Sequence, residues 1–115
     1  MKKKIILLLV LISFNFLFPF VISAAEVLQI KNASTLIIGD QNRNYKIKLA
    51  CLEVNPEKEA IVIELLGSEL PRHTRVNLKP QGAEDGILIS RIISLDSGKD
   101  IGELIASKEL AKKTC

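Results

Sequence analysis

The sequence predicts a small, mainly β fold of the α+β class: a five-stranded barrel with two or three short helices, preceded by a signal peptide. Three observations predict it. Five short segments have strand-like apolar patterns, two segments have helical spacing, and a basic, apolar leader comes before them all. The 90 residues after the leader, 26–115, suffice for one compact domain and leave no room for a second.

The leader has the three parts of a signal peptide. Lys2 to Lys4 are followed by an apolar run from Ile5 to Ile22 and then by the small residues Ser23-Ala24-Ala25. We expect residues 1–25 to be removed near Ala25, which leaves residues 26–115 secreted or periplasmic. The alternative is an uncleaved membrane anchor, since the run approaches spanning length. Both hypotheses place the domain outside the cytoplasm, because the lysines stay inside.

Five segments after the leader have the composition and pattern of strands. Three of them alternate in polarity, the second carries β-branched residues, and the last is almost continuously apolar. They are Val27–Lys31, Ser34–Ile38, Tyr45–Glu53, Arg75–Lys79 and Ile87–Ile93. Turn residues join the second to the third at 39–44, and residues 80–86 are predicted to form a loop between the last two.

The third segment has the clearest alternation, so we expect one face to pack and the other to meet solvent or ligand. The packed face carries Tyr45, Ile47, Leu49 and Cys51, and the opposite face carries Lys46 and Lys48.

Two helices interrupt and close this pattern. Asn55 is a preferred N-cap and Pro56 suits a first helical position, so a helix is predicted from Pro56 to about Leu66, with Gly67 as its stop. Its expected apolar stripe is Ile61, Leu65 and Leu66. Asp100 and Glu103 resemble a capping box at the start of the final helix. The expected buried stripe of that helix is Ile101, Leu104, Ile105 and Ala111.

The order of three strands, helix, two strands and helix is typical of a Greek-key barrel of the OB-fold type. The segment Lys-Leu-Ala-Cys-Leu-Glu from Lys48 to Glu53, followed by Pro56-Glu57, resembles the strand-to-helix corner of the thermonuclease (staphylococcal-nuclease-like, SNase-like) family. That family's motif is Arg-Leu-x-x-x-Asp-x-Pro-Glu, and this chain has one extra residue within it. The strand, turn and helix from Ile87 to Lys112 resemble the family's closing segment.

The resemblance implies a calcium-dependent phosphodiesterase site acting on DNA or RNA. Two arginines would bind the scissile phosphate, a glutamate would act as general base, and two aspartates would help to hold calcium. Carried over, the first arginine is Lys48, the base is Glu57 and the metal-binding aspartate at the strand end is Glu53. The second aspartate becomes Ser34 and the second arginine becomes Ile87, so two charges are missing.

Arg91 cannot replace the missing arginine, because four residues along a strand place it about 13 Å from position 87. The resemblance therefore implies a degenerate nuclease. We expect a catalytically inactive binding or interaction module that requires no cofactor. The alternative is a weak or altered phosphodiesterase that uses Lys48, Glu53 and Glu57, with calcium as its metal.

The partner is left open among a protein, a polysaccharide and an oligonucleotide. Three of the 16 basic residues belong to the leader, which leaves 13 basic and 13 acidic residues in 26–115, and Tyr45 is the only aromatic residue there. Binders of single-stranded nucleic acid combine a basic groove with aromatic platforms, so this composition gives nucleic acid little support. A local basic patch remains open, formed by Lys46, Lys48, Arg72, Arg75 and Lys79. Membrane contact is expected only through an uncleaved leader.

The two cysteines, Cys51 and Cys115, are predicted to form a disulfide, as expected for a small exported domain. Closing so long a loop is worth about 4 kcal/mol in the chain-entropy model. The alternative is two unpaired thiols. His73 is the only histidine, and we expect it to be a surface residue and not a metal ligand.

Overall fold

A closed barrel of five strands forms the body of the molecule. The computed structural model describes residues 25–115, so the predicted signal peptide lies outside the described residues except for Ala25. The barrel strands, in their order around the barrel, are β1 (Ala25–Asn32), β2 (Thr35–Asp40), β3 (Arg43–Leu49), β6 (Ile87–Ser94) and β5 (Arg75–Glu84). Pairing of β1 with β5 closes the barrel, and β3 with β6 is its parallel pair. This confirms the predicted mainly β, α+β fold with an OB-like barrel.

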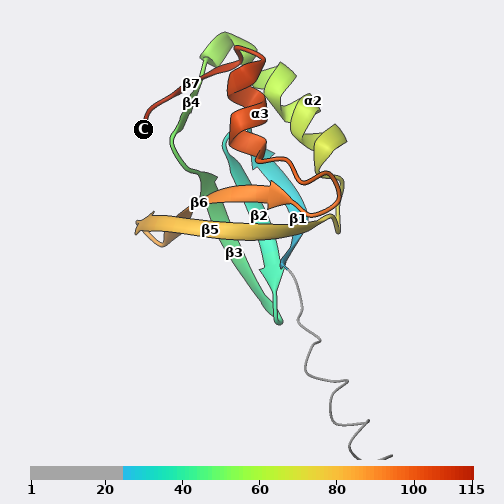
Figure 1. Cartoon of the computed structure of the whole chain (residues 1–115). Helices are drawn as coiled ribbons and strands as arrows, with labels where there is room; N and C mark the ends of the chain where they lie inside the picture. Colours follow the sequence, from blue (N-terminus) through green and yellow to red (C-terminus); the bar gives the residue numbers. More distant parts are fainter. Residues whose placement is uncertain (1–24) are drawn as a thin grey trace, which may run out of the picture.

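Two α-helices and a second, two-stranded sheet complete the described chain. They are the helices α2 (Glu59–Glu69) and α3 (Ile101–Ser107) and the strands β4 (Leu52–Val54) and β7 (Ala111–Lys113). Figure 1 shows both helices and the β4–β7 pair at one end of the barrel, while the β2–β3 hairpin points away from them. No helix within residues 25–115 is long and apolar enough to span a membrane.

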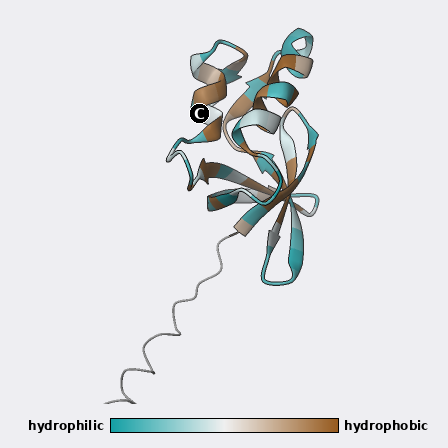
Figure 2. Ribbon diagram, turned by 90° about the vertical axis from the view of Figure 1, so that its right-hand side faces the viewer, coloured by the Kyte–Doolittle hydropathy of each residue, from teal (hydrophilic) through white to brown (hydrophobic). Residues whose placement is uncertain are grey.

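The core lies inside the barrel and beneath the two helices. The largest fully buried side chains come from the barrel strands and both helices, and they include Leu36, Ile38, Ile47, Leu49, Leu66, Ile92, Ile101 and Ile105. Figure 2 shows apolar residues along the crossing strands and the helices, and polar residues at the β2–β3 turn. Burying each large aliphatic side chain contributes about 1.5–3 kcal/mol, so this shared core joins the helices to the barrel.

The predicted third strand is two strands. β3 ends at Leu49, and Cys51 adopts a left-handed backbone conformation with φ 57°, which no continuous strand allows. The chain resumes as β4, which pairs with β7 outside the barrel. Ile47 and Leu49 are buried as predicted. Tyr45 was predicted to pack on the same face, and this is wrong: it pairs with Ile38 in the β2–β3 hairpin and is 38% exposed.

The predicted first helix begins with a tighter turn. Pro56–Lys58 form a 3-10 turn before α2, and Asn55 makes no side-chain capping bond. This turn has about three residues per revolution, so it changes the phase of the α-helix that follows. Val62 and Leu66 face the core, whereas Ile61, predicted to be buried, is 51% exposed. The helix continues past Gly67, so the predicted stop is also wrong.

The predicted loop at residues 80–86 is mostly strand. β5 extends to Glu84 and turns back at Asp85–Gly86, where both residues have positive φ. A register shift between Pro80 and Gly82 marks a β-bulge at Gln81. A bulge tolerates proline and leaves one residue unpaired, which explains how the strand passes Pro80.

The final helix has Asp100 as its N-cap, as predicted, but the Glu103 side chain pairs with Lys113 and does not complete a capping box. The Asp100 carboxylate accepts hydrogen bonds from the backbone N–H groups of Gly102 (3.0 Å) and Glu103 (3.3 Å). Ile101 and Ile105 are buried, which confirms that part of the stripe. Ala111 lies in β7 and not in the helix, because the helix ends at Ser107.

Two substitutions test which face of α2 is buried. Leu66→Ala should lower the free energy of unfolding by about 2–5 kcal/mol, because it leaves a cavity in the core. Ile61→Ala should change it by less than about 0.5 kcal/mol, because that side chain faces solvent. Urea denaturation followed by circular dichroism measures both values. Equal losses in the two variants would contradict the observed phase.

Candidate functional site

A cleft of about 290 Å³ lies beside the end of β3. The β1–β2 turn and Lys48 contribute to it from the barrel, and β4 and the first residue of α2 contribute from outside the barrel. Its lining residues are Asn32, Ala33, Ser34, Lys48, Leu52, Glu53, Val54 and Glu59. The cleft therefore combines one ammonium group, two carboxylates and a hydroxyl with an apolar surface.

The barrel side of the cleft is held by local hydrogen bonds. The Asn32 side-chain oxygen accepts from the Ser34 backbone N–H at 3.0 Å and from the Ser34 hydroxyl at 3.3 Å, which forms an Asx turn. The Ser34 carbonyl in turn accepts from the Leu49 N–H at 2.8 Å. Lys48 pairs with Thr35 across the strands. These bonds set Ser34 and Lys48 next to each other.

The opposite side of the cleft is built from β4 and α2. The turn at Cys51 directs the chain away from the barrel, and β4 then pairs Glu53 with Lys112 of β7. Glu59 begins α2 immediately after the 3-10 turn. Glu53 and Glu59 are exposed, so their carboxylates are available to a ligand.

The structure brings together only part of the site implied by the family resemblance. Lys48, Glu53 and Ser34 line the same cleft. Glu57 does not line it but lies exposed in the 3-10 turn, so its carry-over as the base finds no support in this geometry. Glu59, which the motif does not include, lines the cleft instead.

Neither Ile87 nor Arg91 supplies a second cation to the cleft. Ile87 is half-buried at the start of β6. Arg91 donates from Nε to Asp100 Oδ2 at 2.7 Å, and its Nη2 contacts the same oxygen. Of the five basic residues proposed to gather, only Lys48 lines the cleft.

The cleft offers few charged ligands for a calcium ion. Calcium takes six to eight oxygen ligands, and among residues 25–115 the carboxylates that line the cleft are those of Glu53 and Glu59. Within residues 25–115 there is no group of three or more His, Cys, Asp or Glu residues arranged to hold a metal. His73 confirms its predicted surface position: it is exposed, and its Nδ1 lies 3.1 Å from Glu26 Oε1.

The charged side chains that line the cleft form no ion pairs among the described residues. The ion pairs of the described residues are His73–Glu26, Arg91–Asp100, Lys99–Glu69 and Lys113–Glu103. Lys48, Glu53 and Glu59 belong to none of them. The charged side chains that line the cleft are thus two carboxylates and one ammonium group.

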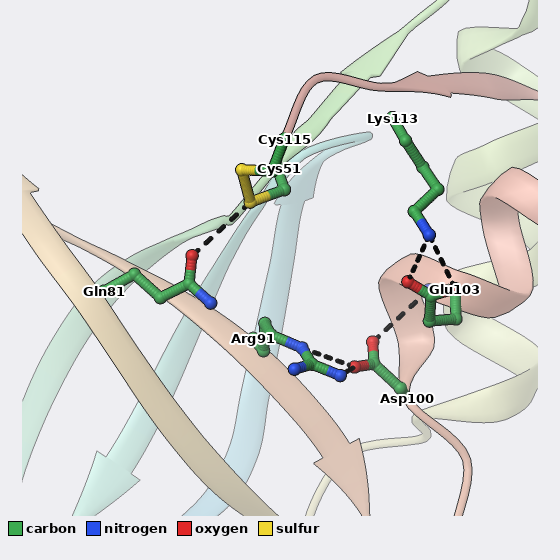
Figure 3. Close-up of a disulfide and its surroundings, with 7 residues drawn as sticks. All are labelled: Cys51, Gln81, Arg91, Asp100, Glu103, Lys113 and Cys115. Atoms are coloured by element: carbon green, nitrogen blue, oxygen red, sulfur yellow. Dashed lines mark hydrogen bonds and ion pairs between the residues drawn. A yellow bond between two sulfur atoms is a disulfide. The ribbon is translucent and has the colours of Figure 1, made fainter.

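A second hollow of about 320 Å³ lies near the first and shares Leu52 with it. The predicted disulfide forms part of its wall: Cys51 and Cys115 are bonded, with their Cα atoms 5.1 Å apart (Figure 3). The Gln81 amide lies 3.4 Å from Cys51 Sγ. A disulfide sulfur carries no proton, so this is a polar contact and not a hydrogen bond donated by Cys51.

The charged side chains of this second hollow already have partners. Figure 3 shows Arg91 directed at Asp100 and Lys113 directed at Glu103, each within an ion pair. The hollow therefore offers no free charged pair comparable with the cleft. Its distinctive feature is the disulfide.

No protein-family model matches the chain, and no curated protein matches it.

Asp100 has two separable roles, as cap of α3 and as partner of Arg91. Asp100→Ala removes both and should lower the free energy of unfolding by about 1–2 kcal/mol, because a lost N-cap leaves helix N–H groups unpaired. Asp100→Asn keeps a cap acceptor and should lose about 0.5–1 kcal/mol, because the ion pair is partly exposed. Thermal and urea unfolding measure the difference. A loss in the asparagine variant as large as that in the alanine variant would show that the ion pair, and not the cap, is the stronger contact.

Proposed function

We propose that the chain is an exported, non-catalytic SNase-like OB-fold domain that binds a polypeptide segment carrying a basic side chain. The observation that carries this proposal is the composition of the cleft, in which Glu53 and Glu59 outnumber Lys48. The family assignment rests on the Lys48–Glu57 motif and on the strand order of the barrel. Export rests on the leader pattern.

Each part of such a polypeptide has a counterpart in the cleft. A lysine or arginine side chain would pair with Glu53 and Glu59. A backbone carbonyl would accept from Lys48, and an apolar side chain would contact Leu52 and Val54. Charge complementarity of this kind contributes specificity more than affinity, so a single segment should bind weakly.

The other two partner classes use the cleft less well. An oligonucleotide would set phosphates against two carboxylates, and none of the cleft's lining residues is an aromatic platform for a base. A neutral polysaccharide would leave the charges of Lys48, Glu53 and Glu59 without counterparts. A polypeptide satisfies both signs of charge.

The second candidate is an altered calcium-dependent phosphodiesterase. It is favoured by one observation, that Ser34, Lys48 and two carboxylates share a cleft. It is weakened by Ile87 in place of an arginine, because phosphoryl transfer depends on cations around the transferring group. The poor calcium ligand set weakens it further.

Two probes separate these candidates. Nuclear magnetic resonance titration with acetyl-Ala-Lys-Ala amide should shift the amide signals of Ser34, Lys48, Glu53 and Glu59, with a dissociation constant near the millimolar range. Glu53→Gln or Glu59→Gln should each weaken binding about fivefold, ~1 kcal/mol. Glu57→Gln makes the same charge change outside the cleft and should have no effect. A ten-residue oligothymidylate should leave the cleft signals unchanged.

The nuclease candidate has its own assay. We expect no cleavage of single-stranded DNA above a chelator control when calcium is added to the full chain. Calcium-dependent cleavage that Glu59→Gln abolishes and Glu57→Gln preserves would refute the non-catalytic proposal and assign the base to Glu59.

A further inference from the structure

The Cys51–Cys115 disulfide closes a part of the structure that the barrel does not hold. β4 and β7 pair at only three positions, and neither strand belongs to the barrel. Two backbone bonds support them, from Asn55 N–H to the Leu110 carbonyl (3.3 Å) and from Thr114 N–H to the Cys51 carbonyl (3.1 Å). The Lys113–Glu103 ion pair is exposed on both sides and adds little. Ala111 and Val54 also pack against the core, and the disulfide adds a covalent attachment at the end of β7.

The disulfide is also open to attack. Cys115 is the exposed last residue, and both cysteines line the 320 Å³ hollow beside the cleft. Accessible disulfides exchange with external thiols more readily than buried ones. In Figure 3 the Gln81 amide oxygen is the labelled group directed at the sulfur atoms, and the two ion pairs lie farther from them. An external thiolate therefore has a route to them.

Opening the disulfide would alter the cleft, because β4 lines the cleft and pairs with β7. Leu52 lines both hollows, and Glu53, which lines the cleft, pairs with Lys112 of β7. Lys48 and Ser34 belong to the barrel side and are bonded within it. Release of β7 would thus free the side of the cleft that carries Glu53 while the side that carries Lys48 stays in place.

We propose that the Cys51–Cys115 disulfide is a thiol-exchange site that controls the β4–β7 side of the cleft. The thiolate of an external dithiol attacks Cys115 Sγ, which forms a mixed disulfide and releases Cys51 as a thiolate. The second thiolate of the reagent then displaces Cys115, and the reagent leaves as a disulfide. The reagent is oxidised by two electrons, and the two cysteine thiolates take up the two protons that it loses.

Hydrogen exchange of the full chain tests this inference without any ligand. After reduction with dithiothreitol, amides in 52–55 and 111–114 should exchange about tenfold faster or more, because their local opening is no longer restrained. Amides of Leu36, Ile38 and Ile47 in the barrel should stay protected after reduction, although less strongly, because the barrel remains folded while the loss of the cross-link lowers its stability. Loss of protection in the barrel together with β4–β7 would overturn the inference and make the disulfide a staple of the whole domain. No acceleration at β4–β7, or resistance to the dithiol, would also overturn it.

A double variant and a binding measurement complete the test. Cys51→Ser/Cys115→Ser should show the fast β4–β7 exchange without reductant and no response to dithiothreitol, whereas Glu103→Gln, with the disulfide intact, should exchange like the unmodified chain. The effect on ligand rests on the proposed function: reduction should weaken binding of acetyl-Ala-Lys-Ala amide about fivefold, as Glu53→Gln does. If both redox forms fail to bind the peptide while β4–β7 still responds, the proposed function fails and the exchange site stands.

Discussion

The left-handed backbone of Cys51, with φ 57°, is the constraint on which the other parts of the structure depend. It ends β3, takes the chain out of the barrel and sets β4 against β7. A residue with a Cβ pays about 1–2 kcal/mol for that conformation, so neighbouring contacts must hold it. The bond to Cys115 and the hydrogen bond from Thr114 N–H to the Cys51 carbonyl provide them. One turn of backbone therefore creates both the cleft and the sheet that closes it.

The cleft has two sides of unequal rigidity. Ser34 and Lys48 belong to paired barrel strands and to an Asx turn bonded to the end of β3. Glu53 belongs to a three-residue strand with one neighbour, and Glu59 begins a helix whose buried residues anchor it to the core. Local stability follows the number of buried contacts and paired backbone groups, so the β4 side opens most easily. The disulfide restrains β7 and, through it, the β4 side of the cleft.

The sequence predicted the barrel well where polarity alone decides, as at Ile47 and Leu49, because alternating residues on a half-buried strand face opposite sides. The prediction failed where an irregular backbone conformation breaks the regular repeat of a strand or helix. Cys51 interrupts a strand without glycine or proline, the 3-10 turn moves Ile61 out of the core, and a bulge at Gln81 carries β5 past Pro80. The site shows the same pattern. The motif singled out Lys48 and Glu53, which line the cleft, but it did not include Glu59, which lines the cleft after the 3-10 turn while Glu57 does not.

Charge decides how this cleft differs from a site for phosphoryl transfer. A transferring phosphoryl group spreads negative charge over its oxygens, and catalysis needs cations arranged around it. Among residues 25–115, Lys48 is the only cation that lines the cleft, Ile87 is half-buried at the start of β6, and Arg91 is already paired with Asp100. Without further cations or a metal, Glu53 and Glu59 would repel a phosphate group. The same two carboxylates would attract a positively charged ligand. Of the two, Glu53 is the one whose position depends on β7. The oxidation state of Cys115 would then regulate the attraction for a basic side chain and leave the Lys48 side unchanged.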